Sequence, residues 1–275
     1  MKHLRRLEHD FLVFDIHQHA GMRPDSDEAE PTVSLDQDVA ARIAFMDFWR
    51  IEHAMLLPAS GYSRPHGIDD TKRLNDALAE YRDRNPQRFL GAAGVVSPRD
   101  GDLAVEEARR CIEELGMKAM VWHHRFDGSV INHAGMHPIL RELARYNIPA
   151  MIHVISDSKL EAPWRLEVLA EKHRDVTFVA LDAFSSPDHA SWMQFIGKRN
   201  SNIVFDTGLL TSAGHSLDRF VEEVGADRLI FGTNFYSSTS VFETPYALHE
   251  VLALDISDTA KAAILGQNAR KLLNV

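Results

Sequence analysis

The chain of 275 residues contains a single cysteine, Cys111, so no disulfide bond can form within it. A lone cysteine inside a helical pattern fits a reducing compartment, and we expect a cytoplasmic protein. No segment approaches the roughly 18 uninterrupted apolar residues that a membrane-spanning helix needs. Near the N-terminus, Glu8, His9 and Asp10 interrupt the apolar core that a signal peptide requires.

The sequence is also short of basic residues. It has 30 lysines and arginines against 40 aspartates and glutamates, a formal net charge of −10. A nucleic-acid-binding protein needs a concentrated basic surface, so we expect a small-molecule substrate, with no nucleic acid and no membrane as a partner. Residues 15–21 lack a glycine-rich phosphate-binding pattern, which argues against an open dinucleotide-binding sheet.

Short apolar runs alternate with helical patterns along the chain. Parallel strands that are buried on both faces give such continuous runs, and eight strand–helix units are typical of an α/β protein with a (β/α)₈ TIM barrel. We predict one domain over residues 1–275, with a polar loop at 21–34 that is either a mobile, solvated loop or a lid over the site. The predicted strands cover residues 11–17, 54–58, 89–96, 117–123, 148–154, 176–181, 203–206 and 228–232.

The segment Asp15-Ile16-His17-Gln18-His19 closes the first predicted strand. Residues two apart in a strand point to the same face, so Asp15, His17 and His19 should project together. Two imidazoles placed in this way can close on one metal ion. The alternative is a pair of hydrogen-bonded or surface histidines, but histidine is the commonest metal ligand.

Polar side chains also lie at the ends of later strands. In a (β/α)₈ barrel these C-terminal ends converge on the active site. His153 lies within an apolar strand, where a buried imidazole needs a partner, and we predict it as a third metal ligand. The pattern leaves open whether His123 or His124 faces inward. The remaining candidates at strand ends are Trp122, Arg125, Asp182, Asp206 and Asn234.

Three histidines and a carboxylate around an open position would form a catalytic transition-metal site. Asp182 ends an otherwise apolar strand, and either it is the fourth ligand or it caps the helix that begins near Pro187. Asp206 is equally well explained by hydrogen bonds to loop backbone. The donor set suits zinc first, with manganese or iron as alternatives.

Motifs along nearly the whole chain resemble those of the amidohydrolase superfamily, in particular the amidohydrolase-2 group of metal-dependent hydrolases and decarboxylases. Each motif is weak alone, but their order and spacing are specific. The resemblance supports a TIM barrel with a divalent metal on His17, His19 and His153. The motifs are the first-strand His-x-His, Gly116-Met117-Lys118-Ala119, and the segments 147–153, 202–207, 227–235 and 264–269.

Two positions depart from the family pattern. The family usually has histidine at the end of the sixth strand, where this chain has Asp182, and aspartate after the eighth, where it has Asn234. An amide cannot accept a proton at neutral pH. We therefore expect Asp182 to act as ligand or base, with His123 or His124 as alternative bases, and Asn234 to bond the substrate or the metal-bound water.

We predict an enzyme that hydrolyses or decarboxylates a small carboxylate- or carbonyl-bearing substrate through a metal-activated water. Arg125 would hold an anionic group of the substrate, with Trp122 and His123 beside it. One alternative is an iron-dependent oxygenase, with two ions in a site that His123 or His124 extends. Another is a non-catalytic, ligand-binding barrel that lacks the strand-eight aspartate. The sequence does not reveal the oligomeric state, although barrels of this kind often form homodimers.

Overall fold

The computed structural model describes residues 8–21, 34–59, 64–155, 158–210, 216–237 and 243–275. Within them, parallel strands form one sheet in the order β8-β7-β6-β5-β4-β3-β2-β1-β9. A loop was predicted at residues 21–34. Except for its first and last residues, this loop lies outside the described residues. The strands are β1 (Val13–Ala20), β2 (Ile51–Pro58), β3 (Phe89–Gly94), β4 (Ala119–Trp122), β5 (Ala150–His153), β6 (Phe178–Leu181), β7 (Ile203–Asp206), β8 (Leu229–Ile230) and β9 (Phe235–Tyr236).

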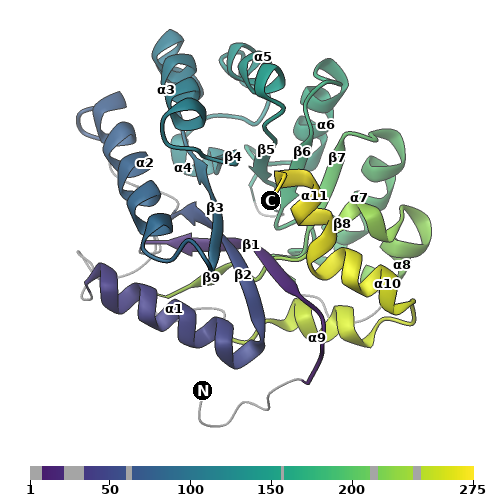
Figure 1. The fold of residues 1–275 in the computed structure, drawn as a ribbon. Coiled ribbons are helices and arrows are strands. Elements are labelled where there is room, and N and C mark those ends of the chain that lie inside the picture. Colours follow the sequence, from purple (N-terminus) through teal and green to yellow (C-terminus); the bar gives the residue numbers. More distant parts are fainter. Residues whose placement is uncertain (1–7, 22–33, 60–63, 156–157, 211–215, 238–242) are drawn as a thin grey trace.

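Helices surround the curled sheet, as Figure 1 shows, and the predicted TIM-barrel fold is confirmed. Two short elements, α4 and β9, were not predicted. The helices are α1 (Leu35–Trp49), α2 (Ile68–Asp83), α3 (Asp102–Glu113), α4 (His124–Asp127), α5 (Met136–Tyr146), α6 (Pro163–Lys172), α7 (Pro187–Arg199), α8 (Ser216–Glu223), α9 (Tyr246–Ala253), α10 (Asp258–Ala262) and α11 (Asn268–Leu273). Three further turns are a π-helix at Ala263–Gln267 and 3₁₀ helices at Pro98–Asp100 and Ala226–Arg228.

The last strand segments close the barrel. β8 pairs with β7, whereas β9, a few residues further on, pairs with β1 through Gln18 and Phe235. Between them, the backbone N–H of Ile16 donates to the carbonyl of Phe231 at 3.1 Å. The first and last strands are therefore joined, and the C-terminal strand ends form one ring.

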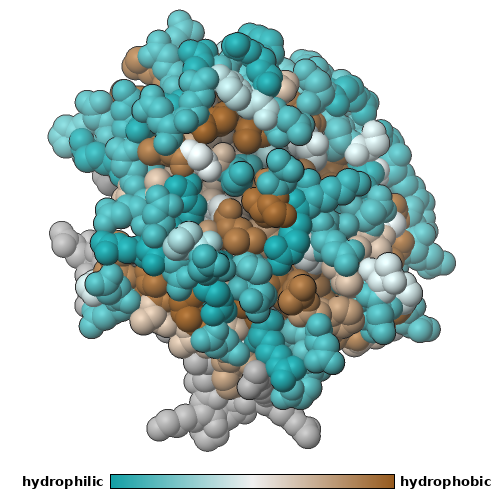
Figure 2. All heavy atoms as spheres, in the orientation of Figure 1, coloured by the Kyte–Doolittle hydropathy of each residue, from teal (hydrophilic) through white to brown (hydrophobic). Residues whose placement is uncertain are grey.

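Two apolar layers follow from the alternation of side chains along the strands. One cluster fills the barrel and includes Phe14, Val121 and Val179, and α11 adds Ala269 and Leu273 to it. The larger cluster lies between the strands and the surrounding helices. α11 lies near the centre of the face seen in Figure 1, and that face is mostly hydrophilic, with a hydrophobic area near its centre (Figure 2). Among the described residues, no helix has the length and apolar character needed to cross a bilayer.

Candidate metal centre

An irregularity in β1 sets the direction of its polar side chains. Asp15 pairs with Ala54 of β2, but Gln18 pairs with Leu56, so β1 holds one extra residue between these pairs. Such a bulge breaks the simple alternation of a strand. His17 and His19 come together as predicted, but Asp15 does not join them. Its carboxylate instead accepts hydrogen bonds from the Thr233 hydroxyl at 2.6 Å and from the Gln18 amide at 2.8 Å.

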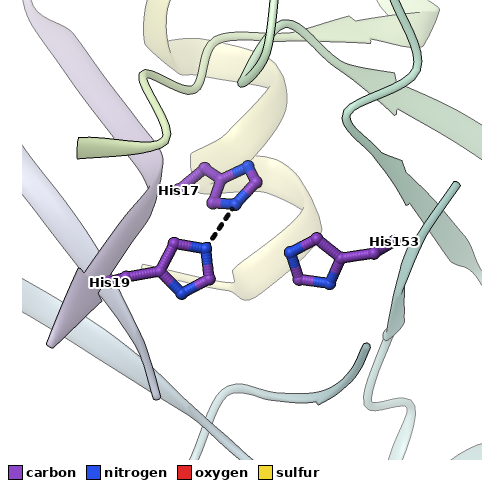
Figure 3. A group of neighbouring side chains, drawn as sticks. All are labelled: His17, His19 and His153. Atoms are coloured by element: carbon purple, nitrogen blue, oxygen red, sulfur yellow. Dashed lines mark hydrogen bonds between the residues drawn. The ribbon is translucent and has the colours of Figure 1, made fainter. Parts of the chain in front are cut away.

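His17, His19 and His153 form one cluster, although β1 and β5 are far apart in the sequence. Figure 3 shows the three rings gathered around a common space. One ring nitrogen from each histidine lies within 4.8 Å of the other two, and all three side chains are buried. The Nε2 atoms of His17 and His19 are 2.9 Å apart. These distances suit three ligands of one ion.

Hydrogen bonds to the outer nitrogens orient the rings. Nδ1 of His19 lies 2.8 Å from the Pro58 carbonyl, and Nδ1 of His153 lies 2.9 Å from the Trp122 carbonyl. A carbonyl can only accept, so both Nδ1 atoms carry the hydrogen and both Nε2 atoms present lone pairs. Nε2 of His153 is buried without a hydrogen-bond partner among the described residues. Buried polar atoms are nearly always satisfied, so this unpartnered nitrogen fits a ligand of a metal ion.

Two buried carboxylates lie beside the histidines. Oδ2 of Asp206 is 3.0 Å from Nδ1 of His17, and Oδ1 of Asp206 accepts the Asp182 backbone N–H at 2.7 Å. The two carboxylate oxygens of Asp182 lie 4.0 Å from His17 Nδ1 and 4.0 Å from His153 Nε2, respectively. Asp182 therefore lies between His17 and His153. Asp206 contacts Nδ1 of His17, whereas Nε2 of the same ring is the nitrogen near His19.

Burial is the largest influence on the pKa values of these groups, and neighbouring charges add to it or oppose it. Burial lowers the pKa of His19 and His153 well below the ordinary value, so both rings are neutral. Burial also opposes charging of His17, but the carboxylates of Asp206 and Asp182 raise its pKa to about 9. Burial raises the pKa of Asp182 to about 7.

A pocket of about 530 Å³ opens next to this cluster, with His153 in its wall. The ring of His123 lies parallel to that of His153, with centroids 4.2 Å apart, and also lines the pocket. Arg64 lies in the same wall and pairs with Asp100. The site therefore joins a candidate metal centre to a space of the size that small-molecule pockets have.

The structure separates the residues predicted around β4. His123 faces the pocket, whereas His124 begins α4 and is buried, with Nδ1 3.0 Å from the Ser129 hydroxyl. Burial lowers the pKa of His124 to about 3. Trp122 borders the pocket, but its side chain belongs to the outer core layer. The Arg125 guanidinium lies over the Phe126 ring, 5.0 Å from its centroid, and is not among the pocket-lining residues.

Asn234, which lies between β8 and β9 and directly precedes β9, is buried and has a positive φ of 56°. Sequence reasoning missed Glu161, a fully buried carboxylate in the connection between β5 and α6. Its Oε1 atom lies 2.5 Å from Nδ1 of His123. Glu161 follows no apolar strand, so no local pattern pointed to it.

The barrel and its convergent histidines define a candidate metalloenzyme of the (β/α)₈ class. A family model described as amidohydrolase matches residues 14–275, and the chain belongs to this family. The predicted family is thereby confirmed. The enzyme class expected from it, a metal-dependent hydrolase or decarboxylase, agrees with relatives that are named decarboxylases.

One curated relative is gamma-resorcylate decarboxylase from Rhodococcus jostii (strain RHA1). It is 35% identical over 147 residues, which make up 50% of this chain and 43% of the relative. The 2-amino-3-carboxymuconate-6-semialdehyde decarboxylase of Dictyostelium discoideum is 29% identical over 86 residues, 31% of this chain and 24% of that protein. The matches thus span less than half of either relative.

Solved structures share the fold over nearly the whole chain. A 5-carboxyvanillate decarboxylase from Novosphingobium aromaticivorans, complexed with manganese and 4-hydroxy-3-methoxy-5-nitrobenzoic acid, superposes with a TM-score of 0.75. It covers 96% of each chain at 18% sequence identity. A 2,6-dihydroxybenzoate decarboxylase complexed with 2,6-dihydroxybenzoate has a TM-score of 0.70, also at 18% identity. At this identity the likeness establishes the fold alone.

Proposed function

We propose that this protein is a metal-dependent decarboxylase of small aromatic carboxylic acids. The observation that carries the proposal is the convergence of His17, His19 and His153 beside a pocket, with the orphaned Nε2 of His153 directed into the site. The decarboxylase names of relatives in the same family support the reaction class. The two solved decarboxylases with benzoate-type ligands support the substrate class.

His17, His19 and His153 would hold one divalent ion, with the Asp182 carboxylate as the fourth ligand. Imidazole and carboxylate donors suit manganese as well as zinc, and a solved relative contains manganese. When bound, such an ion polarises a carboxylate or carbonyl oxygen of the substrate. Asp206 would keep the His17 ring oriented through its 3.0 Å contact with Nδ1.

The family aspartate that would act as the base for hydrolysis is replaced by Asn234, between β8 and β9, and an amide cannot remove a proton from water. The decarboxylase names of the relatives favour decarboxylation as the reaction. Decarboxylation instead breaks the bond to the carboxylate carbon, releases CO₂ and places one proton on the carbon left behind. Asp182, whose carboxylate lies 4.0 Å from Nε2 of His153, is the group beside the metal ligands that could supply this proton.

The test combines metal analysis with CO₂ release from benzoic acid and its hydroxylated derivatives. We expect one equivalent of a divalent metal and equimolar CO₂ and decarboxylated product. His153→Asn should lose both the metal and the activity. The control His137→Asn should keep both, because His137 contacts His173 and does not line the pocket.

Other outcomes would refute the proposal in distinct ways. Two equivalents of iron with oxygen consumption would favour the oxygenase. Cleavage of amides or esters without CO₂ would favour a hydrolase. A melting temperature that ignores both chelator and added metal would favour the non-catalytic barrel.

A further inference from the structure

We propose that Glu161 and His123 together select the substrate. Glu161 holds the His123 ring so that Nε2 acts as a hydrogen-bond acceptor in the pocket wall, and this acceptor favours aromatic acids that carry a hydroxyl donor. The inference rests on the proposed function for the aromatic carboxylate. It assigns a role to two side chains outside the metal ligands.

The contact between the two residues fixes the tautomer of the ring. Oε1 of Glu161 lies 2.5 Å from Nδ1 of His123 and also accepts the backbone N–H of Arg125 at 3.0 Å. Because Oε1 acts as the acceptor for a backbone N–H, it also accepts from the ring, so Nδ1 carries the hydrogen and Nε2 of the neutral ring keeps its lone pair. Glu161 is fully buried, and a buried carboxylate is stable only with such partners.

Aromatic contacts fix the plane of the ring. His123 stacks on His153 at an interplanar angle of 8°, and the Phe126 ring meets it edge-on at 4.5 Å. The His123 side chain is 11% exposed and lines the pocket. Its Nε2 atom has no hydrogen bond within the part of the chain that the structure describes. The ring therefore offers an oriented acceptor next to a proposed metal ligand.

The other charged groups of the pocket are already paired. Arg64 contacts Asp100 and lies 3.6 Å from Asp127, and Arg99 donates to the backbone carbonyl of Asp127 at 3.2 Å. These two aspartates and two arginines balance in charge. The wall away from the metal thus suits a neutral donor, such as a phenolic hydroxyl, better than a second carboxylate.

Matched ligands isolate this hydrogen bond. Calorimetry on the manganese-loaded protein would compare each hydroxybenzoate isomer with benzoate and with the methoxybenzoate of the same isomer, which cannot donate. We expect one hydroxyl isomer to bind about tenfold more tightly than both, the effect of one well-placed hydrogen bond. His123→Phe keeps an aromatic ring but lacks the acceptor, and should reduce the preference below about twofold.

Variants of Glu161 test the positioning role. Glu161→Gln keeps an oxygen that can accept from Nδ1, and should retain most of the preference. Glu161→Leu leaves the ring unfixed and should lose it. His137→Phe, which removes an imidazole outside the pocket, should bind all the ligands as the unmodified protein does.

Nitrogen-15 NMR of the histidine rings reads the tautomer directly, with His123→Phe used to assign the signal. We expect hydrogen on Nδ1 of His123. A hydrogen on Nε2, or a hydroxyl preference that survives His123→Phe, would overturn the proposal. If Glu161→Leu does not fold, the NMR tautomer of His123 and the hydroxyl preference of His123→Phe still test the proposal.

The results also separate this inference from the proposed function. Hydroxybenzoates that bind with the expected preference but release no CO₂ would refute the decarboxylase and leave the selection intact. CO₂ release without dependence of the preference on His123 would refute the selection alone. Failure of every aromatic acid to bind would refute both.

Discussion

Gly232, in the connection between β8 and β9, brings the backbone against the candidate metal centre. A Cβ atom added there would lie 2.7 Å from Cβ of His17 and even closer to Oδ2 of Asp206. The backbone cannot easily retreat, because the Thr207 hydroxyl bonds both the N–H and the carbonyl of Gly232 at 3.1 Å. In Gly232→Ala, the side chains of His17 and Asp206 must therefore move apart.

Two effects should follow from Gly232→Ala. Overpacking of a tight core destabilises a protein by about 1–3 kcal/mol, which urea unfolding of the metal-free protein would measure. Loss of the 3.0 Å contact between Asp206 and His17 removes the hydrogen bond that orients a ligand. Disruption of such outer contacts typically weakens metal binding by about 10–100-fold, and calorimetric titration with Mn²⁺ or Zn²⁺ would detect this.

Gly116→Ala is the matched control. Gly116 has a φ of +62°, and the nearest atom to an added Cβ is Arg82 Nη1 at 3.9 Å. The substitution should reduce stability by about 1 kcal/mol through backbone strain alone and leave metal affinity unchanged. Wild-type metal affinity in Gly232→Ala, or an equal loss of affinity in Gly116→Ala, would refute the reasoning.

Three further predictions concern the buried polar groups. Arg42 is fully buried and donates to the backbone carbonyl of His19 at 2.7 Å, so Arg42→Met should destabilise the fold by about 3–5 kcal/mol in urea; a loss below about 1 kcal/mol would contradict this. The pKa of His124 is lowered to about 3. Below pH ~6.5, His124 therefore binds a proton in the unfolded chain but stays neutral in the folded chain. The contribution of His124 to the free energy of unfolding is present above that pH and falls by about 2 kcal/mol between pH 7 and 5. The slope of stability against pH should be smaller by this amount in urea titrations of His124→Asn, because His19 and His153, whose pKa values are also lowered, keep their own contributions. Asp182→Asn should weaken metal binding in calorimetry, and the double variant with Asn234→Asp should restore part of it; an unchanged affinity in the single variant would exclude Asp182 as a ligand.

The first eight strands could be predicted because each one contains a short apolar run that is buried on both faces. His153 could be predicted for a related reason, since an imidazole within such a run has few other roles. The direction of Asp15 could not be predicted, because the bulge in β1 depends on pairing with β2. The sequence of one strand does not show in which register it pairs with its neighbour, and so does not show where a bulge forms.

Contacts between residues that are far apart in the sequence could not be predicted either. Glu161 and His123 are 38 positions apart and meet because Glu161, shortly before α6, lies against the residue that follows β4. The choice between His123 and His124 depended on where β4 ends and α4 begins, and helix and strand limits are the least certain part of a sequence pattern. Asp206 was recognised as a strand end, but its contact with His17 required the closed barrel.

Backbone geometry helps to explain the residue types at the ends of strands six and eight. Asp182 and Asn234 have positive φ values of 58° and 56°. This conformation is unfavourable for most side chains but tolerated by Asp and Asn. At β6 it accompanies a backbone N–H bonded to Asp206 and a carboxylate 4.0 Å from His153. Relative to the family pattern, one negative charge is lost at β8 and one is gained at β6. The two departures together leave the charge available to a divalent ion unchanged and move it from one strand end to another.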